Sequence, residues 1–453
     1  MNVESVLSRI GDEGIHSVRV VFTDQHGLVR GKAIDATRMG AAFDQGIGVP
    51  GSLLHKDTGN VYAVGLWEPT GDEMLDSLVG ARNIIMRPDP STFHPLPWLR
   101  GTGLILSDLE TTDGRAIEHS TRRICRQALD RLPAHNLAYV AGLELEFHLY
   151  RAGPNGLEHS HPGWDLLGAD TLDRIQPAVE PIREGLAALG LPPLTIEAEL
   201  GPSQIEFTFA PAVGLDVADQ AVLVRSAIKQ LARRNGHQAS FMSRPTIGDE
   251  SFPSGWHLHQ SLVAADDPTG PSLFMPTADA PSLSTLGRQF VAGLLHNAEA
   301  SCLLTTPTVT GYKRYRPKAV APDRISWSHA HRGAMLRIVG GPGDPATRVE
   351  NRAGDPAANP YLYVASQLAS GLEGIENEMV PAAPTESPYD QAGGDLLPRT
   401  LGDAIDAFTA STCYRKAFGD AVVDYLTALK RSEWQRFLSA VTDWEQREYF
   451  EQF

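Results

Sequence analysis

Alternation of apolar and polar residues predicts one long strand in the middle of the chain. Between residues 142 and 150 the sequence reads Gly-Leu-Glu-Leu-Glu-Phe-His-Leu-Tyr, with an apolar side chain at every second position. A period of two is typical of a half-buried strand, and it places Glu144 and Glu146 on one face, roughly 7 Å apart. Two such carboxylates repel each other unless a cation or hydrogen-bond donors lie between them. Taken alone, the stretch fits a solvent-facing strand equally well.

Further along the chain, more segments place polar side chains at every second position. They supply carboxylates, imidazoles and guanidinium groups: Glu197, Glu199, Glu206, His257, His259, Arg348, Glu350 and Arg352. This alternation again favours strands with one polar face. Several strands that carry potential metal ligands on such a face predict a single polar tunnel that holds cations.

The first hundred residues predict a small β-rich domain. We expect a helix over residues 5–14, strands over 18–22, 28–34 and 83–87, and a glycine- and proline-rich loop over 46–51. A cluster of prolines over residues 88–97 indicates a domain boundary. The chain is therefore expected to divide into domains 1–100 and 101–453, with a strand over residues 104–109 opening the second.

The second domain alternates strands with amphipathic helices. We expect strands over residues 142–150, 194–199 and 203–209, and helices over 120–132, 171–189, 216–236, 282–307, 358–376 and most of 400–450. Ser120 and Asp216 are suited to cap two of these helices, and Gly236 is suited to end one. The candidate ligands fall on the strands. His159 and His161 fall in a loop, where we interpret them as surface residues.

Composition and charge narrow the class of protein. The 453 residues carry a formal net charge of −16, which argues against binding to nucleic acid or to an anionic membrane surface. The three widely spaced cysteines fit neither a disulfide framework nor a zinc motif. The chain starts without a basic and apolar leader, and no apolar run approaches the length of a membrane span. We therefore expect a cytoplasmic protein.

Two sets of charged residues need a common explanation. One set offers ligands for hard divalent cations such as Mg²⁺ or Mn²⁺: Glu144, Glu146, Glu199, Glu206, His257 and Glu350. The other is a set of arginines, which suit carboxylates and phosphates: Arg314, Arg332, Arg337, Arg348 and Arg352. Any one arginine could equally be a surface residue. Because the chain lacks a Walker-type loop and a Gly-x-Ser-x-Gly elbow, the two sets indicate ATP chemistry outside the P-loop class.

Five motifs follow one another along nearly the whole chain. They are Gly142-Leu-Glu-Leu-Glu-Phe, Glu199-Leu-Gly-Pro-Ser-Gln-Ile-Glu206, Ser254-Gly-Trp-His-Leu-His-Gln-Ser-Leu, Tyr312-Lys-Arg, and Arg348-Val-Glu-Asn-Arg-Ala-Gly-Asp-Pro-Ala-Ala-Asn-Pro-Tyr361. In this order they resemble the glutamine synthetase family of bacterial type I. The resemblance implies an α+β fold, in which a small N-terminal β-grasp domain precedes a large catalytic domain with a curved antiparallel sheet.

The resemblance also implies roles for individual residues. Two metal sites would be formed by Glu146, Glu199 and Glu206, and by Glu144, His257 and Glu350. The catalytic set would comprise Arg314 and Arg352, which grip glutamate, together with Arg332 and Glu350. The nucleotide would contact His259, Ser261, Arg337 and Arg348. The implied cofactors are ATP and two or more Mg²⁺ or Mn²⁺ ions. The implied assembly is a hexameric ring or a dodecamer with active sites between subunits.

The reaction of the family has two steps. ATP phosphorylates the γ-carboxylate of glutamate, and an amine then displaces the phosphate to form an amide. Glutamine synthetases use ammonium, for which the family supplies an aspartate in the first domain and a glutamate in a flap. Here the matching positions hold Pro50, by an alignment that could instead select Asp44 or Asp57, and Val320. The loss of both acids predicts an organic amine as the acceptor and a γ-glutamylamide as the product.

The identity of the amine stays open at this point. Val320, Leu53 and Leu54 would form an apolar pocket that favours alkyl or aryl monoamines, whereas acidic loop residues could still serve a polyamine. Trp327, His329 and His331 could also line the site, or simply pack elsewhere. Two alternatives remain: an authentic glutamine synthetase that uses ammonium, and a non-catalytic relative that has kept the fold. The complete set of six ligands argues against the second.

Overall fold

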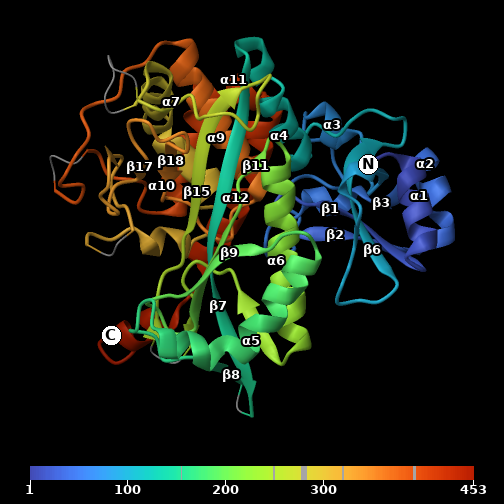
Figure 1. The fold of residues 1–453 in the computed structure, drawn as a ribbon, viewed down its shortest axis with the longest axis horizontal. Helices are drawn as coiled ribbons and strands as arrows, with labels where there is room; N and C mark the ends of the chain where they lie inside the picture. Colours follow the sequence, from blue (N-terminus) through green and yellow to red (C-terminus); the bar gives the residue numbers. More distant parts are fainter. Residues whose placement is uncertain (155, 248–249, 277–282, 319–320, 391–393) are drawn as a thin grey trace.

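The computed structural model describes residues 1–453 except 155, 248–249, 277–282, 319–320 and 391–393. The chain forms two main sheets, and Figure 1 shows the N-terminal sheet at one side of the molecule, beside α4 and α6 of the larger part. None of the helices in the described part of the chain combines the length and the apolar character needed to cross a bilayer.

The N-terminal sheet has six strands. They are β1 (Ser17–Thr23), β2 (Val29–Asp35), β3 (Ile47–Pro50), β4 (Asn83–Pro88), β5 (His94–Pro95) and β6 (Thr102–Thr111). The order is β2-β1-β6-β4-β3, with β5 also paired to β6. The short helices α1 (Val3–Asp12), α2 (Met39–Gln45) and α3 (Glu73–Asp76) accompany the sheet. Its core contains Val18, Val20, Ile84 and Ile105, each fully buried.

Two sequence-based expectations for this region are wrong. Residues 47–50 of the expected glycine-rich loop form β3, because their backbone pairs with the apolar strand β4. The strand expected over residues 104–109 does not open the second domain. It is part of β6, which pairs in parallel with β1 and antiparallel with β4 at the centre of the N-terminal sheet. The division into domains 1–100 and 101–453 remains a proposal, and β6 (Thr102–Thr111) pairs within the N-terminal sheet.

The larger sheet is built around β7 (Leu137–Gly153), a strand of 17 residues. The order is β16-β17-β18-β15-β7-β10-β9, and β8, β11 and β12 also pair with β7. The strands are β8 (Gly156–His159), β9 (Pro193–Ala198), β10 (Gln204–Phe209), β11 (Ala212–Val213), β12 (His237–Ser240), β15 (Trp256–Ala264), β16 (Trp327–Ser328), β17 (Leu336–Val339) and β18 (Arg348–Asn351). A separate pair joins β13 (Thr246–Ile247) to β14 (Glu250–Ser251). All pairings in the large sheet are antiparallel except that of β16 with β17.

Helices alternate with the strands of this sheet along the chain and follow its last strand. They are α4 (Thr121–Leu129), α5 (Ala169–Ala188), α6 (Asp216–Arg234), α7 (Thr285–His296), α8 (Ala298–Thr305), α9 (Pro360–Glu376), α10 (Leu401–Ala410), α11 (Thr412–Phe418), α12 (Asp420–Ser439) and α13 (Asp443–Tyr449). The single helix expected over residues 282–307 is two helices, since α7 ends at His296 and α8 begins at Ala298, with Asn297 between them. The buried row Leu143, Leu145, Phe147 and Leu149 of β7 belongs to the common core.

A buried ion-pair network connects the two parts of the chain. The guanidinium group of Arg122 on α4 donates to Asp219 on α6, at 2.8 and 3.0 Å. It also donates to Asp89, which follows β4, at 2.8 Å, and to Asp108, which lies within β6, at 3.0 Å. Burial alone would lower the pKa of Arg122, but the hydrogen bonds and the charge of Asp219, together with Asp108, raise it above its usual value. Arg122 therefore fixes the N-terminal sheet against α6.

Candidate active site

The register of the large sheet brings the candidate ligands together. Glu146 on β7 lies opposite Glu206 on β10, and Glu206 lies opposite Glu197 on β9. On the other side of β7, Glu144 lies opposite His257 on β15. Directly opposed residues in antiparallel strands have Cβ atoms about 5 Å apart. The alternation read from the sequence therefore becomes a cluster of polar side chains that crosses four strands.

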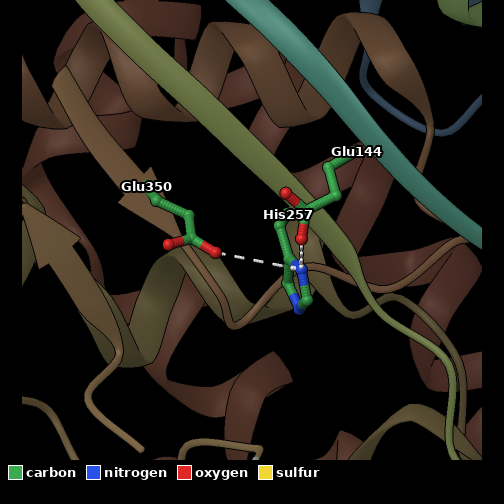
Figure 2. A group of neighbouring side chains, drawn as sticks. All are labelled: Glu144, His257 and Glu350. Atoms are coloured by element: carbon green, nitrogen blue, oxygen red, sulfur yellow. Dashed lines mark hydrogen bonds and ion pairs between the residues drawn. The ribbon is translucent and has the colours of Figure 1, made fainter. Parts of the chain in front are cut away.

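Three groups within this cluster have ligand atoms that all lie within 4.8 Å of one another. They are Glu144 with His257 and Glu350, Glu146 with Glu206 and His257, and Glu197 with Glu199 and Glu206. Figure 2 shows the first group, in which Glu144 and Glu350 both point toward the imidazole of His257. This group is the second metal set expected from the sequence. The first expected set is spread over the other two groups, which share Glu206.

Glu197 is a possible ligand that the sequence-based set left out. It is two residues from Glu199, so the same alternation that marked Glu144 and Glu146 also marks it. Glu199 itself lies just beyond the end of β9, whereas Glu197 lies within the strand. Neither the distance to Glu206 nor the choice between the two could be read from the sequence, because both depend on the pairing of β9 with β10.

The carboxylates of the cluster carry more negative charge than the nearby cationic side chains neutralise. Burial and the nearby Glu199 raise the pKa of Glu146 to about 8. Burial and four surrounding carboxylates, of which Glu144 contributes most, raise the pKa of Glu206 to about 11. Buried carboxylates with such pKa values require either protons or cations. Oxygen-rich groups with one imidazole suit Mg²⁺ or Mn²⁺, so the residues present fit divalent ions.

Glu144 differs from Glu146 and Glu206 in the direction of its pKa shift. Burial opposes its ionisation, but His257 and His259 together lower its pKa well below the usual range. Nε2 of His259 donates to Glu144 Oε2 at 2.9 Å, while Nδ1 of His259 accepts from Nε of Arg348 at 3.1 Å. Because an arginine N–H can only donate, Arg348 fixes the tautomer of His259. The two successive hydrogen bonds from Arg348 to His259 and from His259 to Glu144 therefore orient one oxygen of Glu144.

Glu350 is held by two arginines. Nη1 of Arg352 and Nε of Arg337 donate to its two carboxylate oxygens. Glu350 is fully buried, and although burial opposes its ionisation, Arg352 and His257 lower its pKa. An ionised carboxylate in this position can serve as a ligand at neutral pH.

Arg314 is buried and anchored by backbone carbonyl groups. It donates to the carbonyl oxygens of Ala353 and Gly354 at 3.1 and 2.8 Å, and to that of Arg352 at 3.4 Å. A guanidinium group has five N–H donors, so two of those on Arg314 remain for a ligand. Arg332 is exposed at the rim of the same cavity.

Gln204 positions Glu146, a role that sequence reasoning missed. Nε2 of Gln204 donates to Glu146 Oε2 and, at 3.0 Å, to the carbonyl oxygen of Pro253. Its Oε1 accepts from the backbone N–H of Gly201 at 2.9 Å. Gly201 lies so close to Gln204 and Phe252 that a Cβ would be 2.5 to 2.6 Å from their atoms. The glycine and glutamine of the Glu-Leu-Gly-Pro-Ser-Gln motif thus join β10 to the turn before β15.

Two adjoining cavities meet at this cluster. The first, here called the acidic cavity, has a volume of about 580 Å³ and contains Glu144, Glu146, Glu197, Glu199, Glu206, His257, Arg314, Arg332, Arg337 and Arg352 in its lining. The second, here called the adjoining cavity, has a volume of about 1040 Å³ and is lined in part by His259, Ser261 and Arg348. Glu144, Thr208 and Arg337 line both cavities. Together they have room for two different ligands that meet beside Glu144.

One wall of the acidic cavity is apolar. Leu166 and Leu167, from the segment before α5, line it together with Leu200, Phe252 and Ala321. Leu166 and Leu167 are 53% and 62% exposed, and the exposed Trp164 packs edge-on against Phe252 with ring centroids 5.8 Å apart. Trp164 and Leu167 have φ values of +64° and +57°, which non-glycine residues adopt only when their surroundings enforce it. The wall is a defined feature of the site.

The residues expected to form an amine pocket do not meet in this cavity. Pro50 and Leu53 belong to β3 and the turn after it, and neither lines the acidic or the adjoining cavity. Leu54 is buried in the N-terminal core. Val320 lies outside the described residues. The pocket formed by these residues stays a prediction, and within one chain only the neighbouring Ala321 reaches the acidic cavity.

The aromatic and histidine candidates lie elsewhere. Trp327 is buried and donates to the carbonyl oxygen of Ala382 at 2.7 Å. His331 accepts from the backbone N–H of Gly333 at 2.9 Å, and His329 packs against Trp327. None of the three lines either cavity. His161, interpreted from the sequence as a surface residue, is buried and contacts the carbonyl oxygen of Gln204 at 3.1 Å, so that interpretation is wrong.

The fold and the site together define a two-sheet protein with a carboxylate-rich cavity, and comparison with known proteins identifies its family. Residues 118–449 match the glutamine synthetase catalytic domain. The chain is 39% identical to a gamma-glutamylanilide synthase of Acinetobacter sp, over 99% of this chain and 95% of the relative. It is 31% identical to the gamma-glutamylethanolamide synthetase GlnA4 of Streptomyces coelicolor, over 100% of this chain and 96% of the relative.

Solved structures give the same result. The ligand-free structure titled "Apo GmaS without ligand" has a TM-score of 0.83 and 27% sequence identity, covering 98% of this chain and 99% of that one. The chain belongs to the glutamine synthetase family. The mixed α and β fold expected from the resemblance is confirmed, and so is membership of a family of ligases.

Proposed function

We propose that the protein joins the γ-carboxylate of L-glutamate to an organic amine, at the expense of ATP, through a γ-glutamyl phosphate. One observation carries the proposal: the acidic cavity combines buried carboxylates, arginines and an apolar wall in one space beside a second cavity. The names of two relatives, an anilide synthase and an ethanolamide synthetase, support the same reaction class. A carboxylate is a poor electrophile until one of its oxygens leaves as phosphate, which is why the reaction needs ATP.

The acidic residues are assigned to divalent ions. Glu144, His257 and Glu350 would hold one ion, and Glu206 with Glu146, Glu199 or Glu197 would hold another. Bound Mg²⁺ or Mn²⁺ neutralises phosphate oxygens and polarises the phosphoryl group. Gln204 keeps Glu146 in place through their hydrogen bond, and Arg348 does the same for Glu144 by way of His259.

The arginines are assigned to the anionic substrates. Arg314 has free N–H donors in the acidic cavity and suits a carboxylate of glutamate, as does Arg352 next to it. Arg332 and Arg337 would face the transferred phosphoryl group, on which negative charge is spread in the transition state. His259, Ser261 and Arg348 line the adjoining cavity, which we assign to ATP.

The apolar wall is assigned to the amine. Leu166, Leu167 and Phe252 provide no carboxylate that could hold ammonium or the distal charge of a polyamine. Their surface instead matches an alkyl or aryl group, whose burial contributes roughly 25 cal/mol per Å². We therefore propose an alkyl or aryl monoamine as the acceptor, as the sequence suggested from other residues.

The first test is phosphate release from ATP with Mg²⁺ and glutamate across a panel of amines. The panel contains ammonium, ethylamine, isopropylamine, ethanolamine, aniline, putrescine and spermine. We expect kcat/KM for an alkyl or aryl monoamine to exceed that for ammonium by roughly a hundredfold, about the discrimination that one well-fitted apolar group supplies. Ammonium as the best acceptor would instead identify a glutamine synthetase.

A substitution in the apolar wall tests whether the amine binds there. Leu167→Ala should lower kcat/KM for the best monoamine by roughly tenfold while leaving the KM values for ATP and glutamate unchanged. Leu438→Ala is the matched control, since Leu438 on α12 is similarly exposed and lines neither cavity. Equal losses in both variants, or none in either, would remove the apolar wall from the amine site.

Assembly and location are further parts of the proposal. We propose a homo-oligomeric ring of six or twelve subunits, in which Pro50 and Leu53 reach the acidic cavity of a neighbouring subunit. We also propose a cytoplasmic location, which is supported by three free and buried cysteines. Mass photometry of the purified protein tests the ring directly.

A further inference from the structure

A third cavity lies between the two parts of the chain, away from the acidic site. Its volume is about 870 Å³, which lies within the range of small-molecule pockets. Its walls come from the turn between β1 and β2, one face of α6, the segment after β12, the ends of α8 and α9, and α12. It shares no lining residue with the acidic or the adjoining cavity.

The charge of this cavity is opposite to that of the protein as a whole. The chain has a net charge of −16, yet none of the described residues that line the cavity is Asp or Glu. The lining instead contains five Lys and Arg residues: Arg30, Arg225, Lys229, Arg233 and Lys430. Two of them are neutralised locally, because Arg30 pairs with Asp24 at 2.8 Å and Lys430 pairs with Glu433 at 2.9 Å.

The other three cations form a row along α6. Arg225, Lys229 and Arg233 are spaced by four residues, so they lie on one helix face above one another. Like charges at this spacing destabilise a helix. Within the part of the chain that the structure describes, none of the three pairs with a carboxylate. Arg225 is buried whereas Lys229 and Arg233 are exposed, so the row runs from the interior to the surface and presents its unpaired cations to the cavity.

Arg225 is fixed at the deep end of the row. It donates to the carbonyl oxygens of Pro356 and Ala358 at 2.8 and 2.7 Å, and to that of Gly27 at 3.2 Å. Gly27 has a φ of +79°, and a Cβ there would lie 3.0 Å from both Arg225 and Asn359. Carbonyl oxygens orient the guanidinium group but leave its charge in place. Burial lowers the pKa of Arg225 to about 10, and lost hydration with Arg225 and Arg233 lowers that of Lys229.

We infer that this cavity binds a small organic anion with two or more negative charges. The row on α6 supplies the positive charge, and Leu303, Leu362 and Leu426 on the opposite walls supply apolar contact for the body of the ligand. The anion would bridge the turn after β1 to α6, and it would lie close to the segment that follows Arg352 of the acidic cavity. Carboxylates and phosphate esters share this chemistry.

The test is calorimetric titration of the full-length protein, without ATP or glutamate, with citrate, 3-phosphoglycerate and inorganic phosphate. We expect saturable binding of one or both organic anions, with inorganic phosphate weaker. The double variant Lys229→Gln, Arg233→Gln should bind about tenfold more weakly, and Arg233→Gln alone about threefold. Arg234→Gln is the matched control, because Arg234 lies on the same helix and does not line the cavity; it should bind as the unaltered protein does.

Three results would overturn the inference. The first is no saturable binding of either organic anion up to about 10 mM. The second is unchanged affinity in both the single and the double variant. The third is loss of binding in Arg337→Gln but not in the α6 variants, since the anion would then occupy the acidic cavity. Because no ATP is present, none of these results depends on the proposed ligase reaction.

Discussion

Glu206 is the residue on which the acidic cavity depends most. It belongs to two of the three groups of possible ligands, and four other carboxylates contribute to its raised pKa. Its side chain is 6% exposed, so water cannot screen this repulsion effectively. In the absence of a cation, the cluster would have to retain protons at neutral pH.

Removal of the charge of Glu206 should weaken metal binding without lowering the stability of the metal-free protein. Glu206→Gln is expected to weaken Mn²⁺ binding by at least about tenfold, because a ligand oxygen and its charge are lost. The metal-free variant should unfold at the same or a higher temperature than the unaltered protein, since repulsion is relieved. Titration calorimetry and thermal unfolding in chelator measure the two effects. Glu158→Gln, at a partly exposed carboxylate that pairs with Arg151 at 2.6 Å and lines neither cavity, is the control, and equal Mn²⁺ affinity in both variants would contradict the assignment.

Because of His148, the stability of the folded protein should fall at acidic pH. Burial, followed by the nearby His159 and His161, lowers the pKa of His148 to about 3. The unfolded chain protonates this imidazole near pH 6.5, whereas the folded chain protonates it only near pH 3. The stability that His148 contributes is present above pH 6.5 and is lost as the pH falls toward 3, by about 2 kcal/mol between pH 6.5 and 5.

Urea unfolding at pH 7.5, 6 and 5 in chelator tests this sign. His148→Gln should reduce the loss of unfolding free energy on acidification, even if the variant is less stable at every pH. His237→Gln is the control, because His237 lies partly exposed at the start of β12. A pH dependence that is identical in the two variants would show that His148 does not carry this effect.

At the level of elements, Arg122 joins α4 to α6 and to the N-terminal sheet. Asp219 has little contact with solvent and also accepts a hydrogen bond from Tyr361 at 2.6 Å. Arg122→Met would leave Asp219 buried without its cation, at a cost of about 3 to 5 kcal/mol. Arg115→Met should change stability by less than about 0.5 kcal/mol, because its ion pairs with Glu73 and Asp113 are exposed. Chemical unfolding of both variants makes the comparison, and similar losses would mean that the network does not hold the two parts together.

The elements also show what the sequence could predict. The ligands of β7, β10, β15 and β18 were found because alternation along each strand survives folding unchanged. The position of β6 in the first sheet was missed, because its partners β1 and β4 are distant in sequence and an apolar strand alone does not identify its neighbours. The break between α7 and α8 at Asn297 was missed since apolar periodicity continues through it.

The apolar wall and the third cavity were beyond sequence analysis for a similar reason. Leu166 and Leu167 lie in a segment without periodicity, and only the tertiary structure brings them to the same cavity as Phe252. The row on α6 could be seen as a helical stripe, but a solvated face predicts the same spacing. The row faces a cavity only because the turn after β1 and α12 lie over it, and the sequence does not show that arrangement.

At the level of the whole molecule, the C-terminal segment is unusual in its exposure. Trp444 and Tyr449 on α13 are about half exposed, while Phe450 and Phe453 after it are 75% and fully exposed. Large apolar side chains that gather on a surface mark an interaction site. In a protein proposed to form rings, the simplest partner for this segment is another copy of the chain.

Truncation after Ala440 tests this partner. We expect the full chain to have a mass that is a multiple of 49.0 kDa, and the truncated protein to form a smaller assembly. The fold of each subunit should be unchanged, since none of the residues of α13 is buried in the single chain. A full-length control with Glu445→Gln and Glu448→Gln keeps the apolar groups and should retain the large assembly. Mass photometry compares the three proteins, and an assembly unaffected by truncation would show that the segment does not join subunits. Other exposed large apolar side chains in the described part of the chain, among them Trp67, Trp164 and Leu167, would then be the candidates for the interface.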